Sequence, residues 1–451
     1  MTKQKKVLVY LAIFLVIMAI WFSLSCPPLG KCPFFKTQAK AAKKVTLVFV
    51  GPWDTSDDWG EIIEKFNKYK KKPTNGYLDV SIKYQKVDTL NYQDILENKQ
   101  FNDSDPNIYM IFNAWVPKYK DKIAPMPPEI MTVEEFNNTF AKVTRDDLVS
   151  KDGKIYGLPM YVDTLALYYN EDMFFNANIA KPPETWDEFK ADVEKLTIRD
   201  KDGNFIQMGA AFGGGTNVNR SMDILMVLVM QNNNAAKFKD LVTLSTLNAT
   251  AAVKYYTDFT DPTKAFYTWN DMQMYSIDAF VQKKAAMMIN YSHHIENIND
   301  KTGDTLNFKI APLPQVDINN KVNYANYWVP VVSKKATCKK DKELAKLNCS
   351  QLAWEFLDFA AKKENVKYYL KDVSRPPADL ATAKEQLLKN DAMSVFAGQV
   401  FTAKSWDHPD DAATDAYIEE MINSITTSDS RNKKSLNGAI TILKKRIKVL
   451  N

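Results

Sequence analysis

The sequence predicts an α/β fold in two lobes, and three observations lead to this prediction. Strand-like and helix-like segments alternate from Val45 onward, glycine and proline turn signals separate them, and a chain of 451 residues is too long for one ordinary domain. Hydrophobic residues make up 45% of the chain and charged residues 25%, which is typical of a globular protein and not of a disordered one. Each lobe is therefore expected to hold a mainly parallel sheet flanked by helices.

The N-terminal segment predicts export. Three lysines precede an uninterrupted apolar run over residues 7–24, with the positive charge on the side that stays in the cytoplasm. We interpret residues 1–25 as a signal or membrane-anchoring segment and the Pro-, Lys- and Ala-rich residues 26–44 as a tether. The folded part is then expected outside the cell.

The cysteines indicate lipid attachment or short-range disulfides. Cys26 follows a small residue at the end of the apolar run, which looks like a lipoprotein processing site, although Ser23 stands where that pattern has an aliphatic residue. The alternatives are an uncleaved anchor helix and a disulfide between Cys26 and Cys32. A second pair, Cys338 and Cys349, brackets a charged insertion, and a disulfide there would restrict this loop. No metal site is expected, because neither pair has the spacing of zinc ligands and the chain has only three histidines.

The region after the tether begins with alternating strands and helices. The expected elements are a strand at 45–51, a helix at 53–69, a strand at 78–87 and a segment that ends in a strand at 106–115. Ser56 or Asp57 is expected to cap the helix, with Ile62, Phe66 and other apolar residues on one face. Alternation of this kind favours a parallel sheet whose ligand crevice lies at the carboxyl ends of the strands.

Two Asp-Gly pairs predict hairpin turns, within residues 151–159 and 199–209. For the second turn the alternative is a calcium loop at Asp200, Asp202 and Asn204, but the ligand spacing is incomplete and no Glu closes it. We therefore expect hairpins at both places.

The second half contains further helix and strand signals. Thr185 with Glu188 three residues later forms a capping box, and Trp186 in the first turn of that helix is expected to pack. Gly213 to Thr216 predict a flexible turn that directs Asn217 and Arg220 toward the site. The remaining expected elements are a helix, turn and strand within 276–295, extended segments at 306–315 and 323–336, and helices from 350 to the end.

The order of several motifs resembles a known family. The segments DGKIYGLPMYVDTLALYYNEDMF, PPETWDEF, AAMMINYSHHI, FKIAPLPQ, YANYWVPVVSK and SRPPA are similar to those of the extracellular solute-binding proteins of ABC importers, family 1, the carbohydrate-binding, maltose-binding-protein type. The resemblance implies a two-lobed, periplasmic-binding-protein-like (type II) fold, with a Gly-Leu-Pro corner at the hinge. It implies that lobe 1 holds residues 45–160 and 308–337, and that lobe 2 holds 161–307 and 338–451. The chain would cross between the lobes three times, which suits hinge closure around a ligand.

The resemblance also implies a function. It implies a monomeric receptor on the extracellular face of the cytoplasmic membrane, anchored by a helix or a lipid, which captures a carbohydrate and delivers it to the membrane subunits of an ABC importer. No cofactor and no catalysis are expected, and a net charge of +5 spread along the chain does not argue for nucleic acid. The alternatives are a secreted carbohydrate-active hydrolase and a binder of a polyol or glycerol phosphodiester. For the hydrolase, Asp54, Asp163 and Asp407 are candidate carboxylates.

A sugar site requires flat rings for the C–H faces and polar groups for the hydroxyls. In the family such groups come from the loop after the first strand, the end of the third strand, the crossover segments and late loops. The corresponding residues of this chain are Trp53, Asp54, Asn113, Trp115, Tyr161, Asp163, Tyr291, His293, Asn326, Trp328, Arg375 and Trp406. The alternative for each aromatic residue is packing in a core, and for His293 a solvated turn.

Overall fold

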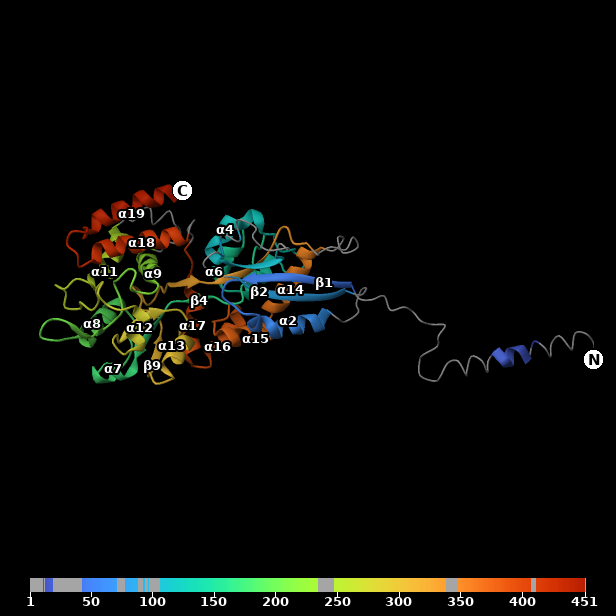
Figure 1. Ribbon diagram of the computed structural model, residues 1–451, viewed down its shortest axis with the longest axis horizontal. Coiled ribbons are helices and arrows are strands. Elements are labelled where there is room, and N and C mark those ends of the chain that lie inside the picture. Colours follow the sequence, from blue (N-terminus) through green and yellow to red (C-terminus); the bar gives the residue numbers. More distant parts are fainter. Residues whose placement is uncertain are drawn as a thin grey trace, which may run out of the picture.

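The computed structural model describes residues 11, 13–18, 43–70, 78–87, 92, 93, 96, 106–233, 247–337, 348–406 and 411–450. Figure 1 shows two bodies side by side, and short strands run between them. Each body has its own hydrophobic core, which we call the first core and the second core in chain order. The α/β, two-lobed class predicted from the sequence is confirmed.

The first core is built on a four-stranded sheet with the strand order β11-β3-β1-β2. β1 pairs in parallel with β2 and β3, and β11 pairs antiparallel with β3. Val45, Leu47 and Phe49 of β1 are buried, as expected for a strand with helices on its faces. The strands are β1 Lys43–Gly51, β2 Leu78–Lys86, β3 Ile108–Phe112 and β11 Trp328–Val332.

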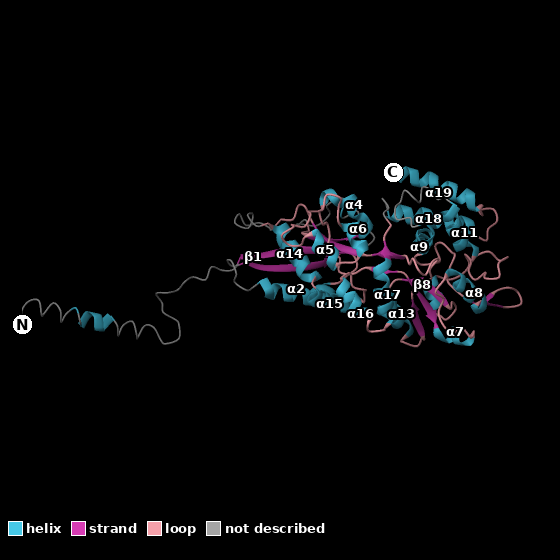
Figure 2. Cartoon of the chain, turned by 180° about the vertical axis from the view of Figure 1, so that it is seen from behind, coloured by secondary structure: helices cyan, strands magenta, loops and turns pink. Residues whose placement is uncertain are grey.

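Helices cover this sheet, and side-chain caps define several of their ends. At α2 (Ser56–Lys70), the Thr55 backbone N–H and hydroxyl donate to Asp58, whose own N–H donates to the Thr55 hydroxyl. The cap is thus Thr55, one residue before Ser56 and two before Asp57. Figure 2 shows α2, α14 and α15 beside β1. The other elements on the first core are η3 Asn113–Trp115, α4 Val116–Tyr119, η4 Lys120–Lys122, α5 Val133–Thr139, α6 Lys142–Leu148, α14 Cys349–Ala361 and α15 Lys363–Val373.

The second core contains a three-stranded sheet with the order β8-β5-β9, and both of its pairings are antiparallel. The prediction of a mainly parallel sheet is therefore wrong for this lobe. Two of its strands, β5 and β8, are buried on both faces as parallel strands usually are, so composition did not indicate their antiparallel pairing. The strands are β5 Ala166–Asn170, β8 Met287–Asn290 and β9 Phe308–Ala311; the predicted second hairpin forms from β6 Ile198–Arg199 and β7 Phe205–Gln207.

The helices of the second core surround α9 (Ser221–Asn233), which is buried along most of its length. The predicted capping box at Thr185 and Glu188 is confirmed at α8, and Trp186 is buried. The other helices here are α7 Glu171–Asn176, α8 Trp186–Leu196, α11 Leu247–Asp258, α12 Ser276–Val281, α13 His294–Thr302, α17 Ala392–Gln399, α18 Asp411–Thr426 and α19 Leu436–Leu450. One further helix, α16 Leu380–Leu387, contacts both α5 and α17. The short η6 Val400–Thr402 follows α17.

A small sheet of order β12-β10-β4 lies between the two bodies. β4 (Asp163–Thr164) pairs antiparallel with β10 (Asn323–Asn326), and β12 (Ala403–Lys404) pairs in parallel with β10. The buried residues change from the first core to the second between Val162 and Leu165. The first crossover therefore lies next to the predicted Gly-Leu-Pro corner.

Two segments pack on a different core from the one predicted. β9 lies in the second sheet, beside β5, whereas the family resemblance implies lobe 1 for residues 308–337. α14 and α15 pack on the first core, whereas the resemblance implies lobe 2 for residues 338–451. An apolar strand or helix face shows that a segment faces a core but does not identify which of two cores it faces.

Several predictions lie outside the described residues, including most of the N-terminal segment, the tether, Cys26, Cys338 and Asp407. Leu11 and residues 13–18 are helical, and no helix in the described part of the chain has the length and apolarity to span a membrane. Cys349 is disulfide-bonded. Its pairing with Cys338 stays a prediction.

Candidate functional site

Five rings gather where the carboxyl ends of the first strands meet the start of β11. We call Trp53, Tyr92, Phe112, Trp115 and Trp328 the aromatic cluster. Trp328 is its centre, with ring centroids 5.3 Å from Trp115, 5.8 Å from Tyr92, 6.1 Å from Phe112 and 6.2 Å from Trp53. The pairing of β11 with β3 sets Trp328 opposite Phe112, and the loop after β1 brings Trp53. Three tryptophans predicted as site residues are thus brought together.

The rings differ in their exposure. Trp53 is 54% exposed and Trp328 is partly exposed, whereas Trp115 is only 7% exposed. The buried indole Nε1 of Trp115 has no hydrogen-bond partner among the described residues. A buried donor of this kind costs free energy until a partner arrives. The cluster therefore offers exposed ring surface and one unsatisfied N–H.

Tyr161 joins the aromatic cluster to a group of polar residues. The backbone N–H of Trp328 donates to the Tyr161 hydroxyl oxygen at 3.2 Å. The guanidinium carbon of Arg375 lies 5.6 Å from the centroid of the Tyr161 ring, which is a cation–π contact. Tyr161 therefore lies between the rings of the first lobe and the arginine that follows α15.

Asp163, Ser292, His293 and Arg375 form what we call the polar cluster. Asp163 accepts hydrogen bonds from the Thr164 N–H at 2.9 Å, the Ser292 N–H at 3.1 Å and the Ser292 hydroxyl at 2.8 Å. Its Oδ2 lies 3.7 Å from Nδ1 of His293. Burial lowers the pKa of His293 below its usual value, although the Asp163 carboxylate opposes this shift. His293 is thus neutral at pH 7 and able to donate from one nitrogen and accept at the other.

Tyr291 packs against the polar cluster through the ring of His293. Its hydroxyl donates to Asp223 at 2.8 Å, and its ring is only 2% exposed. The ring stacks with that of His293, with centroids 6.1 Å apart, and the guanidinium carbon of Arg220 lies 5.3 Å from its centroid. Tyr291 therefore holds His293 and Arg220 in place and presents little surface of its own.

Asp54 is turned into the first core. Its Oδ2 accepts hydrogen bonds from Trp59 Nε1 at 2.9 Å and from the Tyr369 hydroxyl at 3.0 Å. Burial raises the pKa of Asp54, and the two hydrogen bonds oppose that shift. Asn326, which pairs with Asp163 between β10 and β4, is partly exposed. Both residues are partly exposed: Asn326 pairs with Asp163, and the Asp54 charge acts on Arg375.

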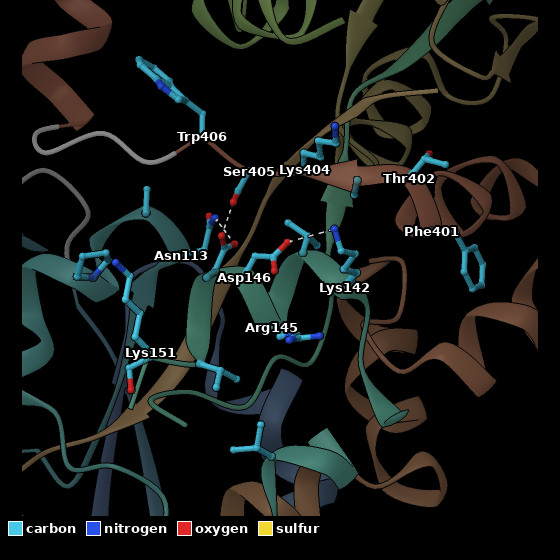
Figure 3. Close-up of a pocket in the computed structure, with 18 of the residues that line it drawn as sticks. Asn113, Lys142, Arg145, Asp146, Lys151, Phe401, Thr402, Lys404, Ser405 and Trp406 are labelled. Carbon is cyan, nitrogen blue, oxygen red and sulfur yellow. Dashed lines mark hydrogen bonds and ion pairs between the residues drawn. The ribbon is translucent and has the colours of Figure 1, made fainter. Parts of the chain in front are cut away.

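Asn113 and Trp406 line a separate pocket of about 940 Å³. At its floor, Asp147 accepts hydrogen bonds from Asn113 Nδ2 at 3.0 Å, from the Tyr327 hydroxyl at 2.7 Å and from the Ser405 hydroxyl. Burial raises the pKa of Asp147 to about 6, although these bonds act in the opposite direction. Figure 3 shows Asn113 and Ser405 close together, with the ring of Trp406 pointing away from them. The structure does not bring these two predicted residues to the aromatic cluster.

Sequence reasoning missed several residues of this region. Phe112 and Tyr92 belong to the aromatic cluster, and Ser292 holds Asp163, yet none was a candidate. Phe112 directly precedes a candidate in the strand, which is a signal that could have found it. Asp147 gave no such signal, because its partners are far away in the sequence.

The described residues offer binding chemistry more clearly than catalysis. Asp54 and Asp163 are both engaged by protein donors. No group of three or more His, Cys, Asp and Glu side chains in the described ranges could hold a metal ion. Rings with exposed faces beside a guanidinium and an imidazole are suited to holding a solute by stacking and hydrogen bonding.

Comparisons with known proteins agree with a binding function. The model of the family described as bacterial extracellular solute-binding protein matches residues 43–367. A putative binding protein of Brucella abortus is 24% identical over 357 residues, which are 75% of this chain and 81% of the relative. The maltodextrin-binding protein MdxE of Bacillus subtilis is 28% identical over 320 residues, 66% of this chain and 69% of that protein.

Solved structures are similar in fold. A solute-binding protein of an ABC transporter from Thermotoga lettingae, bound with alpha-D-tagatose, matches with a TM-score of 0.66 and 19% identity, over 91% of this chain and all of the other. The sugar-binding protein MalE of Xanthomonas citri matches with a TM-score of 0.67 and 17% identity, over 90% and 97% of the two chains. At this level of identity the likeness concerns the fold.

Proposed function

Because the chain belongs to the family of bacterial extracellular solute-binding proteins, we propose that it captures a carbohydrate between its two lobes and delivers it to the membrane subunits of an ABC importer. The family is extracellular, and the two cores would be the lobes that close over the solute. Anchoring by the apolar N-terminal segment or by a lipid on Cys26 belongs to the same proposal.

The observation that carries this proposal is the aromatic cluster beside the polar cluster. Trp53 and Trp328 leave ring surface exposed at the end of the first sheet, and Tyr161 links them to Arg375. Sugars bind to such rings through their C–H faces and to polar groups through their hydroxyls. Relatives named for maltodextrin and structures with bound sugars support the same solute class.

Closure is proposed to occur at the small sheet of β4, β10 and β12. These short strands connect the two cores, and few residues would have to change conformation for the lobes to rotate. A solute that contacts both lobes stabilises the closed state, which would dock on the importer better than the open state.

The proposal is tested by a thermal-shift screen of the purified full-length protein against neutral and charged sugars, oligosaccharides and polyols. A solute that binds only the folded state raises the melting temperature. We expect at least one sugar to do so, to make the protein more compact in X-ray scattering, and to be recovered unchanged. A sugar recovered as hydrolysis products would show an enzyme instead, and a panel without any shift would refute the proposed solute class.

A further inference from the structure

We propose that the solute carries an anionic group, a carboxylate or a phosphate, which binds the guanidinium group of Arg375 beside His293. This inference rests on the proposed function and specifies the class of carbohydrate: a uronic acid or a phosphorylated sugar. It follows from a count of which hydrogen-bonding groups the protein has already used.

The carboxylates of this region are used by the protein itself. Asp163 accepts three hydrogen bonds, from Thr164 and Ser292. Asp54 accepts two, from Trp59 and Tyr369, and Asp223 accepts one from Tyr291. A neutral sugar hydroxyl needs an acceptor for its proton as well as a donor for its oxygen. The described polar groups near Tyr161 offer few free carboxylate acceptors for such protons.

The donors, in contrast, remain available. Arg375 has five N–H donors and is partly buried, yet it makes no hydrogen bond or ion pair with any residue in the described part of the chain. Its guanidinium lies over the Tyr161 ring, and the charges of Asp163 and Asp54 act on it without forming an ion pair. Trp115 Nε1 is likewise buried and unpaired among the described residues. A partly desolvated guanidinium is stabilised by a planar or tetrahedral oxyanion that accepts two parallel hydrogen bonds. A carboxylate or phosphate of the solute would supply these acceptors.

A second arginine, Arg220, lies over the Tyr291 ring, and the Asp223 charge acts on it. Burial is the main cause that lowers the pKa of His293, and the positive charges of both Arg375 and Arg220 add to it. Both guanidinium groups are therefore near this imidazole. The carboxylates whose charges act on Arg375 are Asp163 and Asp54, and both are engaged by protein donors as described. Neither forms an ion pair with Arg375.

The backbone that carries both arginines is held in an unfavourable conformation. Arg220 itself has φ +60°, and Ser374, directly before Arg375, has φ +46°. Left-handed backbone is unfavourable for a residue with a Cβ, and such residues gather at ligand sites. Ser374 ends α15 in this conformation, and the following residues turn so that Tyr161 bridges to Pro377 and Arg375 reaches the Tyr161 ring. Strain at both positions is an observation independent of the hydrogen bonds.

The test compares matched solutes by isothermal titration with the full-length protein. The sets are galactose, galacturonate and galactose 6-phosphate, and trigalacturonate with its neutral methyl ester. We expect a charged member to bind at least about tenfold more tightly than its neutral partner. Its affinity should fall as salt is raised. Equal binding of neutral and charged members, or binding of neutral members only, overturns this inference and leaves the carbohydrate receptor in place; no binding to any of these or to the wider sugar panel refutes both.

The variant Arg375→Gln keeps hydrogen-bond donors but removes the charge and the parallel N–H donors of the guanidinium. We expect it to weaken binding of the charged member by roughly 100-fold and to leave the neutral member within about twofold. Arg375→Lys keeps the charge and should restore part of the loss. The control is Arg199→Gln, an exposed arginine that lies over Tyr267 in the β6–β7 region. If Arg375→Gln weakens both members equally, or if the control weakens binding as much, the inference is wrong.

Discussion

Two regions at the junction of the lobes are built in opposite ways. Around Trp328, rings are partly exposed and the donors of Trp115 and Arg375 have no acceptor among the described residues. Around Asp147, one carboxylate collects donors from Asn113, Tyr327 and Ser405. The pocket at Asp147 has a volume of about 940 Å³, yet the Asp147 carboxylate that lines it is engaged by protein donors. We therefore place the proposed solute site by its exposed rings and the donors of Arg375, and not by hollow space alone.

We expect a different function for each of these two regions. The aromatic cluster with Arg375 would hold the solute, and its loss should change affinity with little effect on folding. The Asp147 network joins the end of β3, the turn between β10 and β11 and the segment after β12, so its loss should change stability with little effect on affinity. Each of the following predictions separates these two effects.

The largest effect on affinity is expected for Trp328→Ala. Trp328 contacts four other rings of the aromatic cluster and remains partly exposed, so its removal takes away stacking surface and the support of its neighbours. We expect solute binding to weaken by roughly 2–3 kcal/mol, as is typical of a central aromatic residue in a binding site. The measurement is the dissociation constant for the solute that raises the melting temperature most.

The matched control for this variant is Phe175→Ala. Phe175 is an aromatic residue of α7 that is 81% exposed and lies in the second lobe, away from the aromatic cluster. Its removal should leave affinity unchanged. An unchanged affinity in Trp328→Ala would mean that the aromatic cluster is a packing feature and would remove the distinction between the two regions.

A smaller effect, on stability, is expected for the Asp147 network as pH changes. The pKa of Asp147 is about 6 in the folded protein and 3.8 in the unfolded reference. Well below pH 3.8 the group is protonated in both states. As pH rises toward 6, the Asp147 carboxyl ionises in the unfolded chain before it ionises in the folded protein, so the folded state loses stability. Well above pH 6 this loss is complete. Because Asp147 is partly exposed, we expect about 2 kcal/mol in total, less than the shift alone would give.

The measurement is chemical denaturation of the wild type and of Asp147→Asn between about pH 4 and pH 7. Asparagine cannot ionise, so the stability difference between the two proteins should change in favour of the variant as pH rises. Solute affinity at neutral pH should be the same for both. A stability difference between the two proteins that does not change with pH would show that the pKa of Asp147 is the same in the folded and unfolded states. A large loss of solute affinity in Asp147→Asn would show that the two regions form one site.

The sequence predicted the local structure well where the cause is local. β1, the β6–β7 hairpin and the capping box of Thr185 and Glu188 follow from patterns within a few residues, and the structure confirms them. The meeting of Trp53, Trp115 and Trp328 was expected from the family resemblance, and the structure brings these residues together. Their contact with a solute stays a prediction.

What could not be predicted depends on contacts across long stretches of sequence. The hydrogen-bond partners of Asp147 lie 34, 180 and 258 residues away along the sequence, so no local pattern predicts this network. Asp54 and Asp163 have the polarity of ligand-binding residues, but only the structure shows that Trp59, Tyr369 and Ser292 engage them. A sequence indicates which residues could bind a ligand. The fold decides which of them already use their hydrogen-bonding groups within the protein.

The smallest effect is expected for Trp53→Ala, which sharpens the comparison within the aromatic cluster itself. Among the described rings Trp53 approaches Trp328 alone, at 6.2 Å, and it is 54% exposed, so it contributes one edge of the cluster and supports no other residue. We expect affinity to fall by about 1 kcal/mol, with no change in melting temperature, and Trp53→Phe to recover most of the loss because a ring face remains. If Trp53→Ala weakened binding more than Trp328→Ala in the same titration, the solute would stack on the outer ring, and the centre of the site would lie in the loop after β1 instead of at the start of β11.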